Sequence, residues 1–114
     1  MNFTVKDTYN AVVITFKGNV MGGPATAKLH ESLNELKEQG KLNVIVDLAK
    51  VKFMNSSGLG MLISALTTMR NAGGDLRLAN PASKIRSLLV VTRLVTVFEH
   101  YDSVEEAVDS FKED

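Results

Sequence analysis

Val44-Ile45-Val46-Asp47-Leu48 is a nearly continuous apolar run, and residues 53–60, a few positions later, read Phe-Met-Asn-Ser-Ser-Gly-Leu-Gly. The first stretch is typical of a strand buried on both faces of a parallel or mixed sheet. The second leads into apolar residues at helical spacing, which are Leu59, Leu62, Ile63, Leu66 and Met69. The sequence therefore predicts a central buried strand followed by a helix that crosses one face of the sheet.

Two strands and a helix are predicted before this unit. Phe3–Val5 and Ala11–Phe16 have strand character and are joined near residues 8–10, so we expect them to pair antiparallel. Pro24 suits a first helical position, and Gly40 suits the residue after a helix end. Apolar residues recur at helical spacing between them: Ala25, Leu29, Leu33 and Leu36. We expect one amphipathic helix there.

Strands and helices alternate after the central helix, which Gly73 and Gly74 end. Leu76–Leu78 is predicted to be a strand, Asn80-Pro81 to open a helix containing Ile85, Leu88 and Leu89, and Val95–Phe98 to be a short last strand. Ser103 and Glu106 have capping-box spacing. They precede the apolar stripe of a final helix, formed by Val104, Ala107, Val108 and Phe111.

The predicted element order is ββαβαβαβα. It describes an α/β fold with a five-stranded mixed sheet and four helices, because helical crossovers oblige the later strands to run largely parallel. The 114 residues suit one domain, which we expect to span residues 1–114.

The charge balance argues against several partners. Thirteen Lys and Arg residues equal thirteen Asp and Glu residues, so no positive excess is available for nucleic acid or an anionic membrane. No cysteine is present, which excludes disulfides, thiolate zinc sites and cysteine nucleophiles. The N-terminus lacks a basic start followed by an apolar run, and no window approaches the length of a membrane span. We expect a cytoplasmic protein without direct nucleic-acid binding and without membrane insertion.

The sequence contains only incomplete versions of the enzymatic motifs considered. Residues 58–63 begin like a dinucleotide fingerprint but have Ile63 where the third small residue is needed. Residues 18–24 are glycine-rich but lack Gly-Lys-Ser/Thr. His30 and His100 have no second ligand at zinc spacing, and sequence alone cannot place them near a serine. We therefore expect no catalytic residue, no cofactor and no metal site.

Ser56 and Ser57 place two adjacent hydroxyls at the start of the central helix, before Gly58 and Gly60. A phosphate esterified there would meet uncovered backbone N–H groups and the positive end of the helix dipole. It would add about 1.5 to 2 negative charges. The surrounding surface is expected to consist of small residues and of Phe53, Met54 and Leu59. A partner docked there would lose an apolar contact and face an unpaired charge.

A purely structural interpretation of the same residues also stands. Asn55 or Ser56 would cap the helix, which contributes about 1 kcal/mol. Gly58 and Gly60 would then allow close helix packing.

Four stretches of the chain follow a known pattern: Val46-Asp47-Leu48, residues 53–60, Asn80-Pro81 and residues 97–103. On these stretches the chain resembles the STAS domain family, specifically the stand-alone anti-sigma factor antagonists of bacteria. The resemblance implies that the second serine of the pair, Ser57, accepts the phosphate. Ser56 is the competitor, although a serine at that position can be consumed as a cap.

The resemblance also implies the partners. The unmodified protein would bind an anti-sigma factor that is a serine kinase, phosphorylation would break the complex, and a PP2C-type phosphatase would restore it. The expected partner-binding residues are Met21, Gly22, Gly23, Phe53, Met54, Asn55, Ser56, Gly58, Leu59 and Gly60.

Two alternatives remain open at this stage. One is a non-phosphorylated STAS subunit of a transporter-associated or stressosome-like assembly, in which residues 55–57 are only structural. The other is an enzyme or small-ligand binder, which would need a pocket of convergent polar groups.

Three positions depart from the family pattern. Asn55 stands where the family usually has Asp, which keeps the capping ability and removes a negative charge. Residues 18–23 contain no acidic residue where the family usually has one, which predicts a less basic or more apolar partner surface. Arg93 replaces a glycine, at a cost on the order of 1 kcal/mol if the position is left-handed.

Overall fold

A mixed sheet with strand order β1-β2-β3-β4-β5 organises the chain. In the computed structural model, which describes residues 1–112, β1 (Asn2–Asp7) pairs antiparallel with β2 (Val12–Lys17). The following strands, β3 (Asn43–Lys50), β4 (Asp75–Ala79) and β5 (His100–Tyr101), continue the sheet in parallel. The antiparallel start and the parallel continuation confirm the predicted α/β topology.

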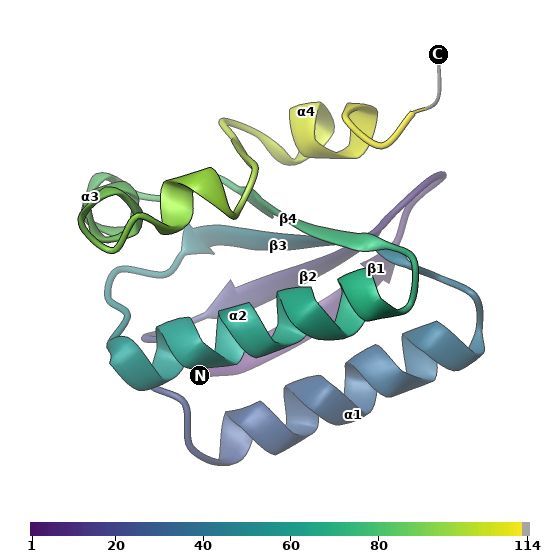
Figure 1. Ribbon diagram of the computed structural model, residues 1–114, viewed down its shortest axis with the longest axis horizontal. Coiled ribbons are helices and arrows are strands. Elements are labelled where there is room, and N and C mark those ends of the chain that lie inside the picture. Colours follow the sequence, from purple (N-terminus) through teal and green to yellow (C-terminus); the bar gives the residue numbers. More distant parts are fainter. Residues whose placement is uncertain (113–114) are drawn as a thin grey trace.

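Helices cover both faces of this sheet. The long helices α1 (Pro24–Glu38) and α2 (Ser56–Asn71) lie side by side on one face, and α4 (Val104–Asp109) lies on the other (Figure 1). The third helix, α3 (Ser83–Val91), contacts the short 3-10 helix Leu94–Thr96 that follows it. Within residues 1–112, no helix combines the length and apolar character that a membrane crossing requires.

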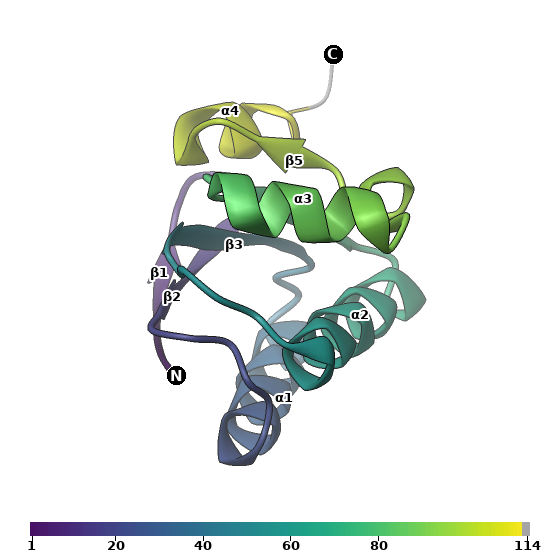
Figure 2. The same cartoon turned by 90° about the vertical axis from the view of Figure 1, so that its left-hand side faces the viewer.

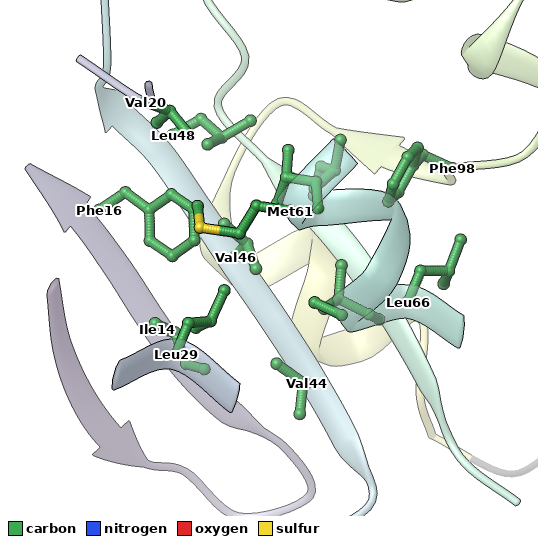
Figure 3. Packing of buried hydrophobic residues seen from close by; sticks show 14 of the residues in the cluster. Ile14, Phe16, Val20, Leu29, Val44, Val46, Leu48, Met61, Leu66 and Phe98 are labelled. Carbon is green, nitrogen blue, oxygen red and sulfur yellow. The ribbon is translucent and has the colours of Figure 1, made fainter. Parts of the chain in front are cut away.

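The main core lies between the sheet and helices α1 and α2. Alternate residues of β3, Val44, Val46 and Leu48, enter it and meet side chains of β2 and both helices (Figure 3). The intervening Ile45 belongs to a second, smaller core beneath α4, together with Ala107. Strand β3 is therefore buried on both faces, as its apolar run predicts.

The predicted strand at Val95–Phe98 is wrong. Leu94–Thr96 forms a 3-10 helix, and the last strand, β5, follows at His100–Tyr101. Val95 and Phe98 both pack on the main core, and this i, i+3 spacing is that of a helical turn. The helix predicted from Asn80-Pro81 likewise begins later, at Ser83, because the backbone of Ala82 is extended and this residue is the N-cap.

Arg93 has a φ of 63°, so the left-handed conformation considered for this position is present. A side chain with a Cβ is strained there, and glycine is not. We expect Arg93→Gly to raise the free energy of unfolding by about 0.5 kcal/mol, the strain relief exceeding the entropy cost of glycine. Urea unfolding measures this change. Ser87→Gly, at an exposed position inside α3, is the control and should destabilise the protein; the same loss in both variants would contradict the expectation.

Candidate functional site

Two segments distant in sequence meet beyond the carboxyl ends of β2 and β3: the loop of residues 18–23 and residues 53–57 at the start of α2 (Figure 2). Val20 and Met54 form an isolated parallel β-bridge. The Val20 N–H donates to the Phe53 carbonyl over 2.9 Å, and the Asn55 N–H donates to the Val20 carbonyl over 3.2 Å. These bonds fasten the glycine-rich loop to the helix start, so the two halves of the predicted partner surface do lie together.

Gly58 makes this close approach possible. A Cβ atom placed on Gly58 would lie 2.0 Å from the Val20 carbonyl oxygen, far inside any tolerable contact. The packing role considered for this glycine is therefore present, and the expectation that Gly58 belongs to the partner-binding surface is wrong, because the residue is buried. Gly60 has no such role, since a Cβ there would meet nothing within 4 Å and the residue is exposed.

Asn55 is the cap of α2. Its side-chain oxygen Oδ1 accepts from the Gly58 N–H over 2.8 Å, and its backbone is extended. Ser56 is the first helical residue and does not cap, so the expectation that capping could consume its hydroxyl is wrong. Ser56 and Ser57 are both exposed, which is the condition for modifying either of them.

Removal of the cap should destabilise the helix start. We expect Asn55→Ala to lower the free energy of unfolding by about 1 kcal/mol, because the Gly58 N–H loses its acceptor. Asn55→Asp keeps the acceptor and adds a negative charge at the positive end of the helix, so it should be at least as stable as the native protein. Urea unfolding of both variants measures this, and equal losses would contradict the capping role.

The exposed apolar part of this surface consists of Met21 and Phe53, which are 46% and 50% exposed. The expectation that Met54 and Leu59 contribute to it is wrong, since both are buried in the main core. Met54 points inward because it lies in the bridge to Val20, and Leu59 lies on the inner stripe of α2. We use the name serine surface for the residues that remain accessible, together with the half-buried Gly22 and Asn55: Met21, Gly22, Gly23, Phe53, Asn55, Ser56, Ser57 and Gly60.

The serine surface is close to the positive ends of two helices. Neither α1 nor α2 carries an acidic residue in its first turn. The N-cap of α1 is Gly23, which offers no side-chain acceptor. The backbone N–H groups of a first helical turn have no acceptor within their helix. The local field therefore favours added negative charge.

A contact between His30 and Ser64 escaped the sequence interpretation. The His30 Nε2 atom on α1 lies 3.1 Å from the Ser64 hydroxyl on α2. Nucleophilic catalysis would also need a group that orients the imidazole, and within residues 1–112 no carboxylate pairs with His30. The pair joins two helices, and no local motif marks residues 34 positions apart.

The STAS domain family model matches residues 2–107. This chain belongs to the STAS domain family, and the resemblance inferred from its motifs is confirmed.

Relatives and solved structures agree with this membership. The anti-sigma-B factor antagonist of Bacillus subtilis is 28% identical over 99 residues, which cover 87% of this chain and 89% of that protein. A crystal structure of a candidate anti-sigma factor antagonist from Thermotoga maritima matches with a TM-score of 0.87 at 22% identity, over 97% of this chain and 95% of the other.

SpoIIAA, an anti-sigma factor antagonist described as a Bacillus cell fate determinant, has been solved in two forms. The unphosphorylated form matches with a TM-score of 0.74 at 22% identity over 96% of each chain. The phosphorylated form matches with a TM-score of 0.73 at 23% identity, over 97% of this chain and all of the other. These structures share the fold of this chain.

Proposed function

We propose that this protein is an anti-sigma factor antagonist that works as a reversible binding module. Its unphosphorylated form binds an anti-sigma factor serine kinase through the serine surface, and phosphorylation of Ser57 releases it. A PP2C-type phosphatase returns the protein to its binding form. The protein acts in the cytoplasm as a substrate of these two enzymes and carries out no catalysis itself.

One observation carries the proposal: Ser57 is exposed in the first turn of α2, beside the loop that carries Met21, and its hydroxyl is not used as the helix cap. The functions named for the relatives support it, because the Bacillus subtilis protein is an anti-sigma-B factor antagonist and SpoIIAA has been solved with and without phosphate.

The release step follows from charge. A phosphate adds about 1.5 to 2 negative charges. Within this protein it is tolerated, because the first turns of α1 and α2 are free of acidic residues. For a partner that packs on Met21 and Phe53, the same group is an unpaired charge inside an apolar interface. Phosphorylation therefore costs the complex more free energy than it costs the free protein.

Ser57 is preferred over Ser56 because of its position. Ser57 contacts Gly22, so it joins the loop and the helix start within one surface. Ser56 is exposed as well and remains the competing acceptor.

The test is to incubate the purified protein with ATP and a lysate of its source cells and to locate the phosphate by peptide mass spectrometry. We expect phosphate on Ser57 that Ser57→Ala abolishes and Ser56→Ala does not. Addition elsewhere that survives Ser57→Ala would overturn the assignment. A complex that forms in the lysate and is indifferent to ATP would instead support a constitutive interaction subunit.

A further inference from the structure

We infer that Gly22 controls how readily Ser57 is modified: without a side chain at residue 22 the Ser57 side chain is uncrowded, and a side chain there would press on the Ser57 Cβ and displace the hydroxyl that it carries. The inference rests on the proposed function, because it concerns how that same serine is modified. Gly22 would then determine specificity through the absence of a side chain and not through a hydrogen bond.

The contact between the two residues is close. A Cβ atom placed on Gly22 would lie 3.0 Å from the Ser57 Cβ, 3.4 Å from its carbonyl carbon and 3.5 Å from its carbonyl oxygen. Its three nearest neighbours therefore all belong to Ser57. Ordinary contacts of a Cβ atom begin near 3.4 Å, so either the loop or Ser57 has to give by a few tenths of an ångström to accept it.

Neither side of this contact can retreat easily. Two residues before Gly22, Val20 is bonded through its N–H and its carbonyl to Phe53 and Asn55. One residue after Ser57, Gly58 lies directly against the Val20 carbonyl. The loop and the helix start are thus held together immediately beside the contact, and an added methyl group is directed onto Ser57.

The effect of crowding Ser57 should be selective. An enzyme that transfers or removes a phosphate needs the serine oxygen in line with the reacting phosphorus, and small displacements of that oxygen slow the step strongly. Ser56 is not among the nearest neighbours of a Cβ on Gly22. A side chain at residue 22 should therefore slow chemistry at Ser57 and leave Ser56 unaffected.

Position 56 is the control within the same protein. Strain that a side chain at residue 22 puts on the loop acts on both phosphoserine proteins, whereas crowding of Ser57 acts on position 57 alone. Gly23→Ala serves as a second perturbation of the loop, since a Cβ on Gly23 would meet nothing within 4 Å. Its strain differs from that of Gly22→Ala, because Gly23 is the N-cap of α1 with a φ of 71° and a ψ of −145°.

The experiment incorporates phosphoserine at position 57 or position 56 during translation. The full chain is prepared with the native loop, with Gly22→Ala and with Gly23→Ala. Phosphate release by a Mn²⁺-dependent PP2C-type phosphatase is then followed for each protein. We expect Gly22→Ala to slow release from position 57 on the order of tenfold relative to the native loop, with no slowing at position 56 and none at either position in Gly23→Ala. An unchanged rate at position 57, or equal slowing at positions 57 and 56, would overturn the inference.

A second substitution at residue 22 guards against misfolding of Gly22→Ala. Asn tolerates positive φ better than other residues with a Cβ, so Gly22→Asn repeats the comparison of positions 57 and 56, with thermal unfolding of each protein as a check. Because the phosphate is installed without a kinase, this result is separate from the lysate test. Native protein that acquires no phosphate on Ser57 overturns the proposed function, whereas an unchanged rate at position 57, or equal slowing at both positions, overturns only the role of Gly22.

Discussion

Gly58→Ala is expected to lower the free energy of unfolding by about 3 kcal/mol, the upper part of the range for overpacked interiors. The added methyl group would lie 2.0 Å from the Val20 carbonyl oxygen. Backbone cannot rotate away as a flexible side chain can. The bridge between Val20 and Met54 must therefore open, and urea unfolding measures the loss.

Gly60→Ala is the matched control for this substitution. It lies two residues further along α2, is exposed, and has open space around its Cβ position. Alanine favours a helix interior over glycine by about 1 kcal/mol, so this variant should be more stable than the native protein. Equal destabilisation by the two substitutions would show that the contact with Val20 is not the cause of the stability loss in Gly58→Ala.

If the proposed function holds, Ser57→Asp is expected to weaken the complex with an anti-sigma factor kinase on the order of 100-fold, because an unpaired buried charge costs several kcal/mol. Ser57→Ala removes only a hydroxyl from an exposed position and should bind within about threefold of the native protein. Isothermal titration calorimetry of each variant against a kinase purified from the source cells by its binding to the native protein measures both affinities.

The charge control for this comparison is Thr67→Asp. Thr67 is exposed on the same helix, ten residues beyond Ser57, so the variant changes the net charge equally. It should leave the affinity nearly unchanged, since separated exposed charges are screened by salt. Equal weakening by both aspartates would contradict an effect local to the serine surface.

Much of the architecture could be predicted because its signals are local. The apolar run at Val44–Leu48 and the spacing of Leu29, Leu33 and Leu36 each report burial within a single segment. The predicted order of strands and helices holds on that basis. The prediction of the last strand was wrong because it also relied on local signals alone. Val95 and Phe98 fit more than one local pattern, and packing against the core selected the helical turn.

The serine surface was predictable only in part. Ser56, Ser57 and the capping ability of Asn55 can be inferred from residue type at a helix start. Residue type does not show which of Phe53, Met54 and Leu59 faces solvent. The bridge between Val20 and Met54 decides the orientation at residue 54, and that bridge joins segments more than 30 residues apart.

Residue patterns alone thus specify the order of strands and helices, the central strand and the two neighbouring hydroxyls, since main-chain hydrogen bonding and burial leave periodic traces in a sequence. The contact of Gly22 with Ser57, the fit of Gly58 against Val20 and the pairing of His30 with Ser64 depend on how the helices and loops dock on the sheet. Docking brings together atoms whose separation along the chain leaves no periodic trace, so these contacts exist only in the folded molecule.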